Sequence, residues 1–182
     1  MSAFIEGQID WARIDVQAIV GDQGIATIDE SRRSPCLQWL RRNDYRIDQF
    51  DCTVGLESFV ERLGMVFRWE QQFGYPLTGD KRNLDALRGG FAVDVPASGG
   101  VVIELFRPDL VWREDSVWLL GLLAIASDHS RYHLACGRRF FTLLVVPEKS
   151  PLLGQTIEQL RVPVAFWIPC DATNRFESRG DA

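Results

Sequence analysis

The stretch VVIELF at residues 101–106 decides the fold class of this chain. It is apolar at every position but one and rich in β-branched residues, which is typical of a strand buried on both faces of a parallel sheet. FFTLLVV at residues 140–146 has the same character, and IATI at residues 25–28 is a shorter run of this kind. YRIDQFDC at residues 45–52 alternates apolar and polar side chains and predicts a further strand.

Helical patterns separate these strands. After Gly55, apolar residues recur at i, i+3, i+4, i+7, i+10 and i+11 from Leu56 to Phe67, which predicts an amphipathic helix. Residues 69–82 contain two glycines and one proline without an apolar period, so we expect a long loop there. Strands that alternate with helices predict an α/β fold with three layers, in which helices cover a parallel sheet of three to four strands. Further helices are expected over residues 10–20, 31–42, 83–90, 108–114 (a single turn) and 116–138.

Composition and charge limit the classes of function that are open to this chain. The 182 residues are 46% hydrophobic and 25% charged, as in a globular protein, and the formal net charge is −5. This acidic balance argues against direct nucleic-acid binding, which needs cations to neutralise phosphates, and would suit a basic partner. The first residues contain acids and no apolar leader, and the longest apolar run, Val117 to Ala126, is too short to span a bilayer. We therefore expect a cytoplasmic protein without a membrane anchor.

The cysteines and histidines do not form a recognisable metal site. The cysteines are widely and irregularly spaced without a C-x-x-C pair, which favours free thiols in a reducing compartment. His129 and His133 stand at i and i+4 in HSRYH, but the glutamate of the metalloprotease pattern and a third histidine are missing. We interpret them as two imidazoles on a helix surface. The four cysteines are Cys36, Cys52, Cys136 and Cys170.

Motifs for catalysis or cofactor binding are also missing. GYPLTGDK at residues 74–81 is similar to a phosphate-binding loop, but Asp80 separates Gly79 from Lys81, and Arg82 replaces the hydroxyl residue that would hold Mg²⁺. No G-x-S-x-G turn presents a nucleophile. The sequence therefore predicts a binding protein with no cofactor and no enzymatic activity.

The stretch FGYPLTGDKRNLDALRGGF at residues 73–91 resembles the signature of the barstar family. Phe73-Gly74 is similar to the family's aromatic-glycine pair, and residues 83–87 match its N-L-D-A-L pentapeptide. The resemblance implies a barstar-like domain over residues 45–147 with the element order β-α-α-β-α-α-β. Residues 1–44 are then an N-terminal β-α extension packed on the core, whose strand is expected to pair with the strand at 46–52. Residues 148–182 are a C-terminal extension or tail.

Members of this family are intracellular inhibitors that plug the cleft of a secreted basic ribonuclease with acids from the motif helix and the loop before it. The resemblance thus implies a protein-binding module, an inhibitor or immunity protein directed at a ribonuclease or toxin. Asp85 matches the family's aspartate in the pentapeptide, whereas Arg88 and Gly89 stand where inhibitory members have an aromatic residue and a second aspartate. The candidate partner-binding residues are Asp85, Asp80, Arg88, Tyr75, Glu70 and Gly89.

Two other functions stay open. One is a small α/β enzyme with a deep cleft at the carboxyl ends of the strands, which would contain acids of perturbed pKa or the Cys52 thiol. The other is a structural or regulatory subunit that docks on a second copy through the apolar stretch from Val162 to Ile168.

Overall fold

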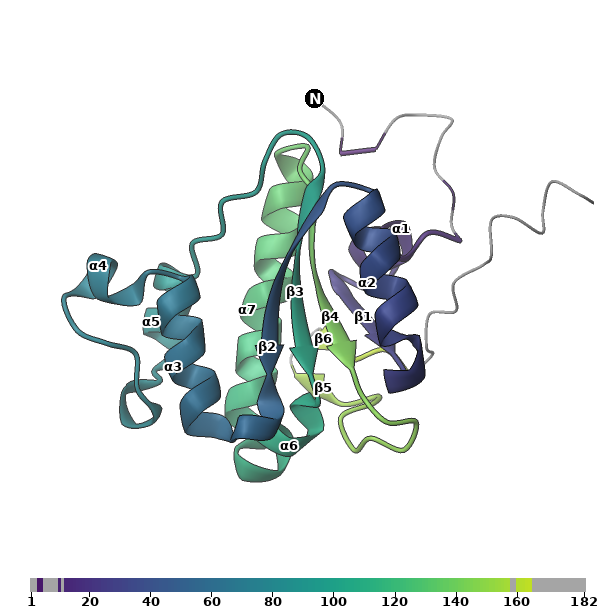
Figure 1. Ribbon diagram of the computed structural model, residues 1–182. Coiled ribbons are helices and arrows are strands. Elements are labelled where there is room, and N and C mark those ends of the chain that lie inside the picture. The colour runs from purple at the N-terminus through teal and green to yellow at the C-terminus, as the bar shows by residue number, and fades with distance from the viewer. Residues whose placement is uncertain (1–2, 5–9, 11, 158–159, 165–182) are drawn as a thin grey trace, which may run out of the picture.

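A parallel four-stranded sheet lies between two layers of helices in the residues that the computed structural model describes, which are 3–4, 10, 12–157 and 160–164 (Figure 1). This confirms the three-layer α/β fold. The strands follow one another across the sheet in the order β1-β4-β3-β2. Their bounds are β1 Ile25–Ile28, β2 Tyr45–Asp51, β3 Gly100–Phe106 and β4 Phe140–Val145.

The position of β1 differs from the prediction. It pairs with β4, with Ile25 beside Thr142, and does not touch β2, which lies at the opposite edge of the sheet. The 3-10 turn η2 (Glu30–Arg32) and helix α2 (Arg33–Arg42) carry the chain across one face from β1 to β2. All four residues of β1 are buried, so the strand fits beside the wholly buried β4 and would be exposed next to the half-polar β2.

One face of the sheet is covered by the N-terminal helices. The short α1 (Ile14–Val16) continues into the π-helical turn η1 (Gln17–Gly21), which confirms a short helix within residues 10–20, and α2 lies beside them. Apolar residues from these helices enclose a core with the side chains that the strands direct to this face. The strand residues of this cluster are Ala26, Ile28, Tyr45, Val102, Phe141, Leu143 and Val145.

The second face is covered by a larger set of helices. Leu56, Phe59, Val60 and Leu63 form the buried stripe of α3, as their spacing predicts. Helix α7 begins after Asp115, whose Oδ1 accepts a hydrogen bond from the amide of Trp118 at 3.0 Å. The helix before α7 has seven residues, which is longer than the single turn expected. The bounds are α3 Leu56–Val66, α5 Leu84–Gly90, α6 Pro108–Glu114 and α7 Ser116–Ala135, with the 3-10 turn η3 at Cys52–Val54.

The loop expected over residues 69–82 contains a helix, α4 (Trp69–Phe73), and a 3-10 turn, η4 (Gly79–Lys81). Arg68 adopts a left-handed conformation (φ 52°) that separates α4 from α3. Trp69 is fully buried and stacks on Phe73 with ring centroids 4.3 Å apart. A contact between aromatic rings four residues apart favours one helical turn, although the segment is too short to show a clear apolar period.

The segment after β4 returns to the domain. Strands β5 (Thr156–Ile157) and β6 (Leu160–Arg161) form a small antiparallel hairpin, and Leu152 and Val162 are buried in the larger core. Val162, the first residue of the stretch expected to dock on a second copy, is therefore used inside its own chain. Residues 165–168 of that stretch lie outside the described residues. None of the helices described is both long and apolar enough to cross a membrane.

Candidate protein-binding surface

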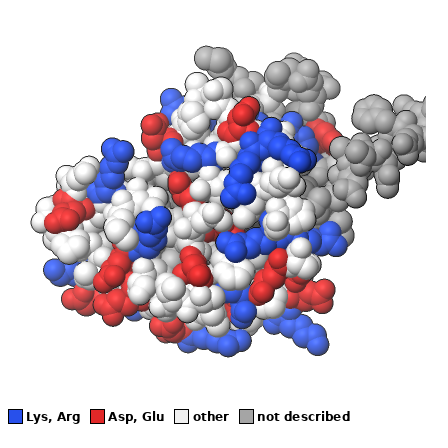
Figure 2. All heavy atoms as spheres, viewed as in Figure 1, with Lys and Arg blue, Asp and Glu red and all other residues white. Residues whose placement is uncertain are grey.

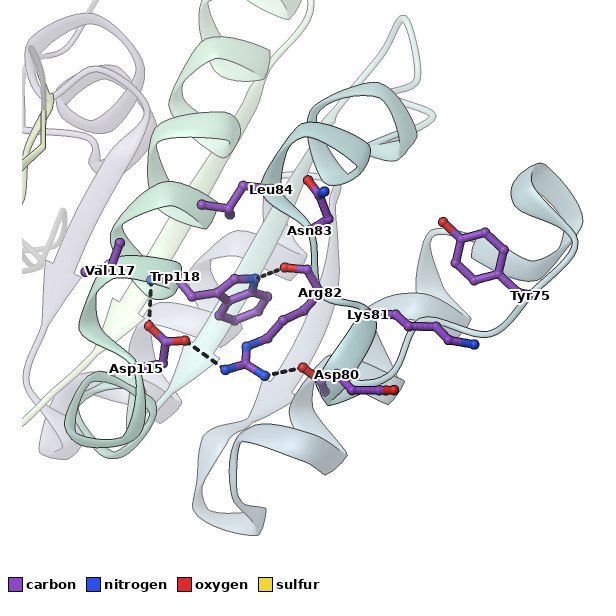
Figure 3. A pocket seen from close by; sticks show the side chains of 10 residues that line it. Tyr75, Asp80, Lys81, Arg82, Asn83, Leu84, Asp115, Val117 and Trp118 are labelled. Atoms are coloured by element: carbon purple, nitrogen blue, oxygen red, sulfur yellow. Dashed lines mark hydrogen bonds and ion pairs between the residues drawn. The ribbon is translucent and has the colours of Figure 1, made fainter.

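The segment before α5 is fastened to the start of α7 by Arg82 (Figure 3). Its Nη2 lies 2.8 Å from Oδ2 of Asp115, and its Nη1 donates to the carbonyl oxygen of Gly79. In return, the indole Nε1 of Trp118 donates to the carbonyl oxygen of Arg82 at 3.0 Å. Contacts on both the side chain and the main chain of Arg82 hold residues 79–83 in one position relative to α7.

Asn83 then starts α5. Its Oδ1 accepts hydrogen bonds from the amides of Asp85 at 2.7 Å and Ala86 at 3.3 Å, so Asn83 is the N-cap of the helix. Leu87 is fully buried, so the opposite face of the helix points to solvent. Asp85 and Arg88 both lie on that exposed face, as their i, i+3 spacing predicts.

A shallow hollow of about 930 Å³ opens between η4, the start of α5 and the start of α7 (Figure 3). Tyr75 and Asp80 line one side of it, and Val117 and Trp118 line the other. Val117 is 71% exposed although it is apolar and sits in the first turn of a helix. An exposed valine beside an aromatic ring gives this hollow an apolar contact surface within a polar rim, as in protein interfaces.

The charges at the rim are fixed by neighbouring groups. Thr78 Oγ1 donates to Oδ1 of Asp80 at 2.5 Å, and this hydrogen bond lowers the pKa of the Asp80 carboxyl. Asp80 therefore stays ionised at neutral pH. The ammonium of Lys81 lies 5.6 Å from the centre of the Tyr75 ring, within the range of a cation–π contact. The rim thus carries both an anion and a ring-bound cation.

The structure brings together only some of the predicted binding residues. Tyr75 and Asp80 line the hollow described above. Asp85, Arg88 and Gly89 are exposed on α5 but do not line it. Glu70 lines a separate hollow of about 500 Å³ between α3 and the segment 69–78. The predicted set is therefore divided between two separate hollows and the exposed face of α5.

Arg88 and Gly89 differ in what surrounds them. Arg88 Nη1 forms an ion pair at 2.8 Å with Oδ2 of Asp128 on α7, and Arg131 contacts the same carboxylate. The positive charge of Arg88 is thus partly neutralised by Asp128, so it is not directed at Asp85 alone. A Cβ atom added at Gly89 would meet no atom within 4 Å, so this position is open to a larger side chain.

Sequence reasoning missed the contribution of α7 to this surface. Asp115, Val117 and Trp118 follow the motif segment by some thirty residues, and nothing in their local pattern places them beside it. It also missed the aromatic group of Trp69, Phe73 and Tyr75, in which the Phe73 and Tyr75 centroids are 6.2 Å apart. The i, i+4 spacing of Trp69 and Phe73 was the available signal.

The expectation that both histidines lie on a helix surface is wrong. His133 is buried against Phe140, with ring centroids 5.6 Å apart, and His129 is half-buried on Phe91 at 4.8 Å. Burial lowers the pKa of both imidazoles. No group of three His, Cys, Asp or Glu side chains that could hold a metal ion is found in the part of the chain that the structure describes.

The two buried cysteines are poor candidates for nucleophiles. Cys52 is fully buried, and burial raises the pKa of its thiol far above neutral pH. Burial also raises the pKa of Cys36 to about 12. Cys136 is exposed, and Cys170 lies outside the described residues. Because a protonated, buried thiol does not attack a substrate, Cys52 does not support the enzyme alternative.

Tyr75, Asp80, Val117 and Trp118 thus form a surface of one acid, two aromatic rings and one exposed valine. No family model matches this chain, and no curated protein or solved structure is significantly similar to it.

Proposed function

We propose that this chain is a barstar-like protein-binding module that captures a basic protein, such as a ribonuclease or a toxin. The proposal rests on one observation above all. The exposed acids of α5 and of the segment before it stand on a platform that Arg82, Asp115 and Trp118 hold in place. A surface that is already ordered loses little conformational entropy when it binds.

The charges on this platform suit a cationic partner. Asp80 and Asp85 are exposed, and Glu57 on α3 lies beside Gly79 next to them. Figure 2 shows acidic side chains gathered at the lower left of the molecule, over the segment between α4 and α5. A nuclease cleft must be cationic to hold phosphate, so fixed carboxylates can occupy it in place of the substrate and speed the encounter.

The arrangement of elements supports the resemblance to the barstar family. From residue 45 to residue 145 the chain runs β2-α3-α4-α5-β3-α6-α7-β4, which follows the family's β-α-α-β-α-α-β plan with α4 added. The motif residues also have structural reasons for their identities. Leu84 packs against Gly121 of α7, Leu87 is buried, and Asn83 caps the helix that presents Asp85.

The test is a binding titration of the full chain with purified basic ribonucleases and with the product of the neighbouring gene. We expect micromolar or tighter binding that weakens as salt is added, because the attraction is between charges. Replacing both acids, Asp80→Asn with Asp85→Asn, should raise Kd by about tenfold or more. Glu148→Gln, an exposed acid after β4, is the matched control and should leave Kd unchanged.

A gain-of-function variant makes the test sharper. Gly89→Asp adds an acid at the position where inhibitory members of the family have one, and the site has room for it. It should strengthen binding to the same ribonuclease. If no basic protein binds, or if the Asp80→Asn/Asp85→Asn variant binds as well as the control, this surface is not the site and the proposal fails.

A further inference from the structure

The two edges of the sheet differ in exposure. All four residues of β1 are buried, so another strand cannot add to that edge. At the other edge, β2 exposes Arg46 and Gln49 along a strand of seven residues. Within the described part of the chain, β2 pairs with β3 only. An exposed strand with one unpaired side can accept a further strand.

The hydrogen bonding of β2 shows which of its residues are available. The carbonyl oxygen of Asp44, just before the strand, accepts from the amide of Gly100 at 3.3 Å, so it faces β3. Main-chain groups alternate in direction along a strand. Those of Arg46 and Asp48 therefore face β3, and those of Ile47 and Gln49 face outward.

The charges on β2 are self-complementary in one register. Arg46 and Asp48 lie two residues apart and so on the same face of the sheet. If a second copy adds antiparallel with the two Ile47 residues opposite each other, Arg46 of each copy faces Asp48 of the other. The outward main-chain N–H and C=O groups of the two Ile47 residues then form hydrogen bonds with each other. The charged pairs fall at the non-hydrogen-bonded positions, where Cα atoms approach to about 4.5 Å and side chains are closest.

The adjacent registers lack this match. Pairing centred on Asp48 would place two aspartates opposite each other, and pairing centred on Arg46 would oppose two arginines. Both also place inward main-chain groups at the centre, where they are already bonded to β3. Like charges directly opposite each other are destabilising. Of these three registers, only the one centred on Ile47 satisfies both the main chain and the charges.

We propose that two copies of this chain associate through their β2 edges, antiparallel about a twofold axis at Ile47, and form one continuous sheet. The second copy is the partner that the charge pattern fits, because an isologous contact requires a self-complementary surface. This inference is independent of the proposed function, since it uses the β2 edge of the sheet and none of the predicted binding residues.

The surroundings of Arg46 allow its ion pair with Asp48 of the same chain to be replaced by one with Asp48 of the second copy. Within one chain, Nη2 of Arg46 lies 3.2 Å from Oδ2 of Asp48, and Nη1 donates to the carbonyl oxygen of Asp94 at 3.1 Å. Their side chains are 48% and 22% exposed, so neither charge is locked in the core. A hollow of about 720 Å³ beside both residues reaches Arg68 and Asp94 and can take the side chains of an added strand.

Analytical ultracentrifugation of the full chain tests the proposal, with three variants. The wild type should dimerise as its concentration is raised. Arg46→Asp and Asp48→Arg should each weaken self-association by about tenfold or more, because each replaces two attractive cross-strand pairs with two repulsive ones. Arg62→Asp, an exposed charge on α3, is the control and should dimerise like the wild type.

Mixing the two charge variants decides between this interface and any other. Arg46→Asp and Asp48→Arg place opposite charges across the strands only when they pair with each other, so the mixture should recover dimers that contain one copy of each. The pair within one chain is not restored by mixing, so a purely intramolecular effect would give no recovery. A wild type that stays monomeric up to millimolar concentration, or dimers that both variants leave intact, would overturn the proposal.

Discussion

The guanidinium of Arg82 lies 2.8 Å from Oδ2 of Asp115, and this ion pair joins the segment before α5 to the first turn of α7. The other oxygen of the same carboxylate, Oδ1, caps α7 by accepting from the amide of Trp118. The hydrogen bond with Arg82, followed by the one with Trp118, lowers the pKa of Asp115. One side chain therefore both starts a long helix and fixes the candidate binding segment.

Replacing Asp115 separates these two roles. Asp115→Ala removes the cap and the ion pair and should lower the free energy of unfolding by about 1–2 kcal/mol, most of it from the cap. Asp115→Ser retains a capping hydroxyl without the ion pair, so its loss should be smaller, about 0.5 kcal/mol. Urea unfolding of both variants measures the difference. Equal losses would show that the ion pair, and not the cap, accounts for the stabilisation.

The adjacent glycines Gly89 and Gly90 should respond to alanine in opposite directions. A Cβ at Gly89 meets no atom within 4 Å, so Gly89→Ala should stabilise the protein by about 0.5 kcal/mol through helix propensity. A Cβ at Gly90 would lie 2.6 Å from Phe73 Cε2 and 2.7 Å from Trp69 Cζ3. Gly90→Ala should therefore destabilise by about 1–3 kcal/mol. Thermal unfolding measures the stability of both variants. If both substitutions stabilised the protein, or both destabilised it, the packing of α4 against α5 would be contradicted.

Glu104 carries a fully buried carboxylate in the middle of β3. Arg33 Nε lies 2.5 Å from its Oε1, and Gln49 Nε2 donates to its Oε2 at 2.5 Å. Arg33→Ala would leave a buried charge without its cation and should cost about 2–4 kcal/mol. The double variant Arg33→Met with Glu104→Leu removes both charges and should be more stable than Arg33→Ala alone. Chemical denaturation compares them, and a double variant that is no more stable than the single one would contradict this account.

The sequence was sufficient to predict the strands and most of the helices, because their signals are local. VVIELF and the stripe from Leu56 to Phe67 predict a buried strand and an amphipathic helix, and the structure has both. The neighbour of β1 was predicted wrongly. The choice between β2 and β4 depends on which strand is buried on both faces, and the chain order of strands does not contain that information.

The candidate surface was predictable only in part, for a similar reason. The exposure of Asp85 and Arg88 follows from helix periodicity once Asn83 is recognised as the cap. The contribution of Val117 and Trp118 depends on how α7 packs beside α5, which is a tertiary contact. The buried ion pair of Glu104 could not be predicted from a single acid in an apolar strand, because its partners come from β2 and α2.

The burial of the two histidines predicts a loss of stability in mild acid. Burial lowers the pKa of His129 and His133 in the folded protein, and Nδ1 of His133 finds no hydrogen-bond partner among the residues described. The unfolded chain binds protons near the ordinary histidine pKa of about 6.5, so below that pH it binds more protons than the folded protein. Stability should be full above about pH 6.5 and should fall as the pH drops through the folded pKa values.

The histidine residues can be tested apart from the carboxylates by urea unfolding between pH 7.5 and about pH 5.5, above the range in which ordinary Asp and Glu titrate. The chain has only two histidines, so His129→Gln with His133→Gln removes every imidazole. The double variant should lose most of the pH dependence in this window, even if it is less stable throughout. Because His129 packs on Phe91, which directly follows α5, and His133 packs on Phe140 of β4, the loss in the wild type should appear first as weaker packing of α7 on these two neighbours. A wild-type stability that stays constant or rises as the pH falls through this window would show that the imidazoles are not held neutral by burial.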